Sequence, residues 1–95
     1  MQVISFWTEV KEVYADDGLV LIIGRYNHKD ENQIGDKCLG IHWGDFPQSR
    51  GILSPCVVPP STRDAILAGL LHQAVIDKKS DVIKKLMEAI EYFKW

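Results

Sequence analysis

The sequence predicts an α+β fold in which a small, mostly antiparallel sheet of about three strands packs against helices. Three observations lead to this prediction. The run LVLIIGRY at 19–26 is β-branched and aliphatic, which is typical of a buried strand. Two segments, 61–77 and 80–93, repeat apolar residues at helical spacing. Clusters of Gly, Pro, Asn and Asp separate these segments, as expected for turns.

The first element, residues 3–15, favours an amphipathic helix. Its apolar residues recur every three or four positions: Val3, Phe6, Trp7, Val10, Val13 and Tyr14. A strand is the alternative, because Asp16-Asp17-Gly18 is a good hairpin turn that would pair this segment with 19–26. Simple strand alternation would place Glu12 on the same face as Phe6 and Val10. We therefore expect the helix.

After the central strand at 19–26, the polar stretch 27–36 reads as a loop. The next segment, 37–43, is a second strand antiparallel to the first, and its Gly40 indicates a bulge or a close approach by another group. A third short strand is expected over 52–58. Pro55 interrupts it and lacks a ladder donor, so this strand belongs at an edge.

The C-terminal third predicts two helices that form an antiparallel hairpin packed on the sheet. Ser61 is a candidate N-cap, with Asp64 three residues later, and this helix runs to about Asp77. Ser80 caps the last helix. Its apolar stripe comprises Ile83, Leu86, Met87, Ile90 and Phe93.

Length and charge restrict the class of protein. At 95 residues, the chain predicts a single domain, 1–95. Its formal net charge of −2 argues against a dedicated nucleic-acid binder, since such proteins carry a basic excess. No apolar run approaches the roughly 18 residues of a membrane span. The N-terminus has no signal-like stretch, so the expected location is the cytoplasm.

Cysteine and histidine patterns predict neither a metal nor a cofactor. Cys38 and Cys56 form no CxxC pair and do not have zinc-ligand spacing with a histidine. We expect both to be reduced and buried; a disulfide between them is the alternative if they lie on neighbouring strands. The three histidines match no local metal motif.

The best candidate for chemistry is His42, at the end of a predicted strand. The loop that follows carries Asp45, Ser49 and Arg50, which supply a carboxylate, a hydroxyl and an anion-binding guanidinium. A simpler interpretation makes Asp45 a turn cap and pairs it with Arg50 at the surface. We favour the simpler one, because the chain has no nucleophile elbow, phosphate loop or paired-carboxylate motif.

Large aromatic residues suggest a binding surface. They are numerous for a small core: Trp7, Tyr26, Trp43, Phe46 and Trp95. They either fill that core or anchor an interface, which is a common role of aromatic residues and Arg. The leading hypothesis is a noncatalytic binding module that forms a homodimer. It would bind a protein partner or small ligand around Trp43, Phe46 and Arg50.

Two alternatives stay open. One is a small enzyme that uses His42 with Asp45 or Ser49. The other is a regulatory nucleic-acid binder that uses the lysines of the helical turn over 78–85. Acidic residues interleave these lysines, so a solvated turn is favoured.

Two segments, KCLGIHW at 37–43 and VPPSTRDAILAGLL at 58–71, resemble parts of small uncharacterised bacterial proteins. In size and style the chain is similar to proteins encoded on mobile integron gene cassettes. The resemblance implies a bacterial, cytoplasmic accessory protein, often oligomeric, whose function is unassigned. It implies no activity and no functional residue.

Overall fold

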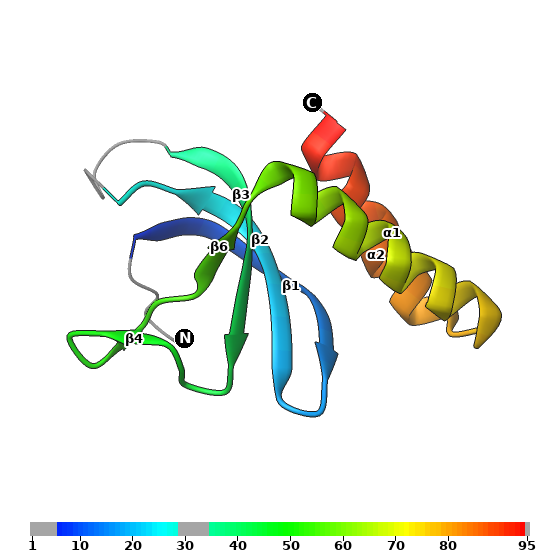
Figure 1. The fold of residues 1–95 in the computed structure, drawn as a ribbon, viewed down its shortest axis with the longest axis horizontal. Coiled ribbons are helices and arrows are strands. Elements are labelled where there is room, and N and C mark those ends of the chain that lie inside the picture. The colour runs from blue at the N-terminus through cyan, green and yellow to red at the C-terminus, as the bar shows by residue number, and fades with distance from the viewer. Residues whose placement is uncertain (1–5, 29–34, 95) are drawn as a thin grey trace.

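The computed structural model describes residues 6–28 and 35–94 (Figure 1). Its elements are β1 (Trp7–Asp16), β2 (Leu19–Tyr26), β3 (Asp36–Trp43), β4 (Gln48–Ser49), β5 (Ile52–Leu53), β6 (Cys56–Val58), α1 (Pro60–Ile76) and α2 (Ser80–Lys94). A four-stranded antiparallel sheet has the order β1-β2-β3-β6, and β4 and β5 form a separate two-stranded sheet. Figure 1 shows the two helices on one side of the main sheet and the β4–β5 hairpin on the other.

The expected N-terminal helix is wrong: residues 7–16 form strand β1. This strand pairs antiparallel with β2 through the hairpin turn at Asp17 and Gly18. Both turn residues have positive φ angles, 49° and 87°, as a two-residue turn of type I′ requires. The Asp16-Asp17-Gly18 signal for a hairpin therefore outweighs the helical spacing of the apolar residues. Residues 3–5 of the expected helix lie outside the described part of the chain.

The cause of the error is two irregularities in β1. The register against β2 shifts between Thr8 and Lys11 and again between Glu12 and Tyr14. Each bulge inserts an extra residue and resets which side chains face the core. Regular alternation would place Trp7 and Val13, six positions apart, on the same face of the sheet. Instead Val13, 1% exposed, lies in the main core, and Trp7, 5% exposed, covers Gly40 on the opposite face. Broken alternation of this kind imitates a helical pattern, so the position of Glu12 was no evidence against a strand.

The main sheet has four strands rather than about three, because β1 joins it. Strand β2 has the predicted bounds and occupies a central position beside β3. The predicted third strand is split into β5 and β6 by Ser54 and Pro55. Only β6 pairs with β3, where it forms the edge of the sheet, as the proline predicts.

Helices α1 and α2 lie where the sequence predicts them, but neither begins at its predicted cap. In α2, Ser80 is the first helical residue, and the N–H of Ile83 donates to the carbonyl oxygen of Lys79. The first residue of α1 is Pro60, and the N-cap residue Pro59 makes no side-chain capping hydrogen bond. Proline suits the first helical position because its fixed φ fits the helix and its missing N–H has no partner there. The predicted cap at Ser61 is therefore wrong, and Ser61 lies within the first turn.

The main core lies between the sheet and the helical hairpin. Alternate residues of the central strands face it, and the helices contribute mainly their inward positions. The buried members are Val13, Leu21, Ile23, Leu39, Val58, Leu67, Ala74, Leu86 and Ala89. This core fixes one face of the sheet and leaves the opposite face to be covered by other side chains.

Trp7 covers the opposite face. Its indole N–H donates a hydrogen bond to the carbonyl oxygen of Pro55 at 3.2 Å, so the ring reaches from β1 to the segment before β6. A Cβ built on Gly40 would lie 2.7 Å from two carbons of this indole. The expected close approach at Gly40 is confirmed, and the group that approaches is the Trp7 ring.

Candidate functional site

The strand β3 ends in a tight turn that brings Trp43 and Phe46 together. The backbone N–H of Trp43 donates to the carbonyl oxygen of Phe46 at 2.7 Å, and the reciprocal bond measures 2.9 Å. Gly44, between them, has a φ of 54° and donates its N–H to Gly18 in the β1–β2 turn at 3.2 Å. The turn is thus held by backbone bonds on two sides.

Both aromatic side chains of this turn are exposed. Trp43 retains 53% of its accessible surface and Phe46 retains 65%. We call these two residues the aromatic turn. Trp7, in contrast, is buried, and Tyr26 is half-buried with its ring 5.3 Å from that of Trp7. Of the aromatic residues singled out in the sequence, Trp7 and Tyr26 thus belong to the interior, whereas Trp43 and Phe46 lie exposed at this turn. Trp95 lies outside the described residues.

His42 is buried, and its ring contacts the turn that follows β3. It is 8% exposed, and its Nδ1 lies 2.9 Å from the carbonyl oxygen of Gly44. A carbonyl oxygen only accepts, so Nδ1 carries the proton and the ring orientation is fixed. The His42 ring therefore supports the turn that presents Trp43.

Arg50 and Ser49 belong to a different hairpin from the aromatic turn. Ser49 ends β4, and Arg50 and Gly51 form the connection to β5 with φ angles of 54° and 76°. Arg50 is exposed at this tip. The structure thus brings Trp43 and Phe46 together through direct bonds, while Arg50 lies on the neighbouring hairpin. Ile52, 38% exposed, is a further apolar residue there that the sequence reasoning missed.

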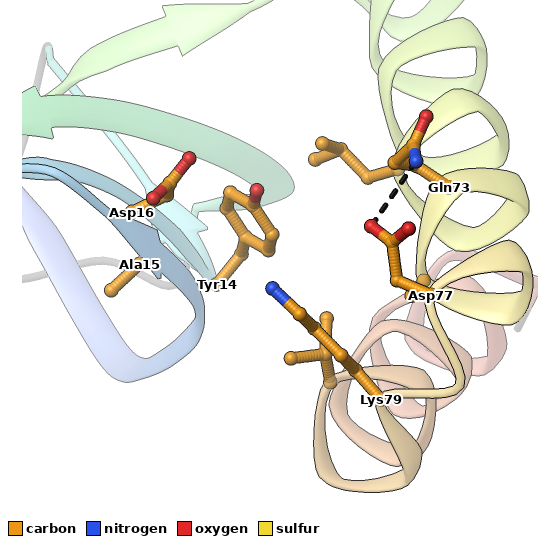
Figure 2. Close-up of a pocket in the computed structure, with 9 residues that line it drawn as sticks. Tyr14, Ala15, Asp16, Gln73, Asp77 and Lys79 are labelled. Carbon is orange, nitrogen blue, oxygen red and sulfur yellow. Dashed lines mark hydrogen bonds between the residues drawn. The ribbon is translucent and has the colours of Figure 1, made fainter.

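A pocket that the sequence reasoning also missed lies between β1 and the helical turn (Figure 2). It has a volume of about 190 Å³. Polar groups that line it come from Tyr14, Asp16, Gln73, Asp77 and Lys79, and apolar groups come from Ala15, Leu70, Ala74 and Val82. Figure 2 shows the Lys79 side chain extending from the helical turn toward Tyr14. The pocket could not be predicted while residues 3–15 were read as a helix.

Side chains of both charge signs line this pocket. Gln73 donates its side-chain N–H to Asp77 at 3.1 Å, and Lys79 lines the same pocket as the carboxylates of Asp16 and Asp77. A smaller adjoining pocket likewise combines Lys85 with Glu12 and Asp81. Lys79 and Lys85 thus share their pockets with carboxylates, which is not the composition typical of a basic patch for nucleic acid.

The two cysteines are free thiols in different surroundings. Cys38 is half-buried, and burial is the main cause that raises the pKa of its thiol. Nearby Asp36 raises this pKa further, whereas Arg63 lowers it. Cys56 is exposed on the edge strand β6, so the expectation that both cysteines are buried is wrong for Cys56.

No helix among residues 6–28 and 35–94 combines the length and the apolar character needed to cross a membrane. No group of three or more His, Cys, Asp or Glu side chains in this part is arranged to hold a metal ion.

Comparisons of the chain with protein-family models, with curated proteins and with solved structures gave no match.

Proposed function

We propose that this chain is a noncatalytic binding module that attaches to a protein partner through the aromatic turn, Trp43 and Phe46. The observation that carries the proposal is the exposure of two large aromatic side chains, 53% and 65%, on a turn held by reciprocal backbone bonds. Such a turn is already ordered before binding, so little conformational entropy is lost in the complex.

The shape of the surface favours a protein over a small molecule. Small-molecule sites are concave, whereas exposed side chains on a tight turn project from the surface. Aromatic side chains that enter a pocket of a partner are the usual anchors of protein interfaces. Exposed Arg50, on the neighbouring hairpin, supplies a cation that can contact an acidic rim.

The resemblance of 37–43 and 58–71 to cassette-encoded proteins supports a setting for this module. We place it in the bacterial cytoplasm, as an accessory protein whose activity depends on the partner that it binds.

Photo-crosslinking in bacterial cells tests the proposal. A photoreactive phenylalanine replaces Phe46 in one chain and Lys84, on the exposed face of α2, in a control chain. We expect a protein adduct from position 46 that is absent from position 84, and Trp43→Ala should reduce its yield. An adduct pattern that is the same at both positions, or is unchanged by Trp43→Ala, would show that the aromatic turn is not a binding surface.

A further inference from the structure

Helix α1 carries an apolar stripe on the side that faces away from the core. Its inward positions Leu67 and Ala74 are buried. From Ala65 onward its exposed positions are Ala65, Ala68, Gly69, His72, Gln73, Val75 and Ile76. Six of them, all except Gln73, recur at intervals of three and four. We call these six residues the outer stripe. Val75 and Ile76 are 56% and 57% exposed.

The neighbouring helix shows that this is not the ordinary composition of an exposed face. On α2 the exposed positions are mostly charged: Asp81, Lys84, Lys85, Met87, Glu91 and Lys94. The outer stripe has one polar side chain, His72, and it contains no Asp, Glu, Lys or Arg. From Ala65 to Ile76, His72 and Gln73 are the two polar residues of α1. A helix segment that is apolar on nearly all sides is normally covered on all of them. In this chain, only one side of α1 is covered.

Gly69 lies in the interior of α1, on the outer stripe. A glycine there costs about 1 kcal/mol of helix stability relative to alanine. A Cβ built on Gly69 would meet no atom within 4 Å, so packing inside this chain does not require a glycine. A residue without a side chain does allow a second helix to approach the backbone closely.

The sizes of the side chains along the outer stripe favour a second copy of this chain as the partner that covers it. The N-terminal half is small, with Ala65, Ala68 and Gly69, and the C-terminal half is bulky, with Val75 and Ile76. Two such helices packed antiparallel place the bulky half of each against the small half of the other. In the symmetric register Ala65 faces Ile76 of the second copy, and Gly69 faces its His72. One surface is then complementary to itself, as a twofold dimer requires.

Helix electrostatics favour the same orientation. The N-terminal end of a helix carries a partial positive charge, and the C-terminal end carries a partial negative charge. Antiparallel packing brings the start of α1 in one copy next to its end in the other, so unlike partial charges become neighbours. A parallel arrangement would bring like partial charges together and bulky residues against bulky ones.

We propose that a second copy of this chain packs antiparallel on the outer stripe of α1 and forms a homodimer. This interface is separate from the aromatic turn, so the dimer presents two aromatic turns to partners. Formation of this dimer does not depend on partner binding by Trp43 and Phe46.

Solution mass measured by size exclusion with light scattering, over a series of protein concentrations, tests the dimer. The full chain of 10.8 kDa should run at twice that mass at high concentration. Ala65→Glu and Ile76→Lys each place a charge in the apolar seam, and each should raise the dissociation constant more than about tenfold. Val57→Glu, at a position on β6 that is 40% exposed, is the matched control and should leave the mass unchanged.

Mixing the two charged variants tests the antiparallel register. In the mixed dimer, Glu at 65 faces Lys at 76 at one end, and the wild-type contact persists at the other. We expect the mixture to regain the dimer mass that neither variant shows alone, while circular dichroism shows that each variant is folded. A monomeric wild-type chain, a dimer that both variants leave intact, or a mixture that stays monomeric would overturn the proposal. So would a dimer that Trp43→Ala dissociates and Ala65→Glu does not.

Discussion

The Trp7 indole occupies the space that a side chain at position 40 would fill. A Cβ on Gly40 would stand 2.7 Å from carbons Cη2 and Cζ2 of the ring and 2.9 Å from a carbon of Ile22. Contacts this short force the indole to move. We therefore expect Gly40→Ala to lower the free energy of unfolding by about 1–3 kcal/mol, measured by urea denaturation.

A Trp7→Leu background provides the control for this prediction. Leucine is too short to reach over Gly40, so only the contact with Ile22 remains, and the cost of the added methyl group should fall markedly. The difference between the two costs measures the coupling of Trp7 to Gly40. An equal cost of Gly40→Ala in both backgrounds would mean that a backbone effect, and not the indole, requires glycine there.

This relationship also shows what could be predicted from the sequence and what could not. A glycine in the middle of a strand pattern indicates a close approach, and Gly40 was identified in this way. The approaching group could not be identified, because Trp7 lay in a segment expected to be helical. The interaction joins residues 33 positions apart in the chain, and local patterns contain no information about such pairs.

The N-terminal error has a specific physical origin. Periodicity assumes a regular strand, and the bulges between Thr8 and Lys11 and between Glu12 and Tyr14 change the period. Elements without bulges, such as β2, were predicted with their observed bounds. For the candidate site, residue types drew attention to Trp43 and Phe46, and their role there stays a prediction. Their exposure, and the burial of Trp7, depended on the tertiary arrangement.

The ion pair between Lys11 on β1 and Glu88 on α2 gives a prediction for pH dependence. The hydrogen bond and charge of Lys11 hold the pKa of Glu88 below its usual value. Because the folded chain favours the charged carboxylate, the stabilisation is complete above the usual Glu pKa. It is lost as the pH falls through the lowered pKa of the folded state.

NMR titration of the Glu88 carboxyl group checks this. We expect Lys11→Met to move its pKa up toward the usual value, with a smaller rise for Lys84→Met, since Lys84 is a lesser cause. If the two variants shift the pKa equally, the carboxylate responds to general positive charge and not to the pair with Lys11.

The two thiols should differ in their reactivity toward iodoacetamide. Thiolate is the reactive form, and burial both raises the Cys38 pKa and restricts access. Exposed Cys56 should therefore be alkylated first at mildly alkaline pH, followed slowly by Cys38. Mass spectrometry after partial labelling measures the order. In the Cys56→Ser variant the fast phase should disappear; a persistent fast phase would assign it to Cys38.

The hydroxyl of Tyr92, near the end of α2, is buried and has no hydrogen-bond partner among residues 6–28 and 35–94. Burial raises the pKa of this phenol. A buried polar group without a partner loses its bonds to water and gains nothing in return. The Tyr92 carbonyl, in contrast, accepts a hydrogen bond from the Lys37 ammonium at 2.9 Å, which a change of side chain leaves in place.

Tyr92→Phe should consequently leave the free energy of unfolding unchanged or raise it by up to about 1 kcal/mol. Tyr14→Phe is the comparison, since Tyr14 lines the pocket of Figure 2, where its phenol is among polar groups. Thermal and urea denaturation of both variants provide the measurement. A loss of more than about 1 kcal/mol for Tyr92→Phe would mean that the hydroxyl does have a partner, such as a bound water molecule that bridges it to the backbone.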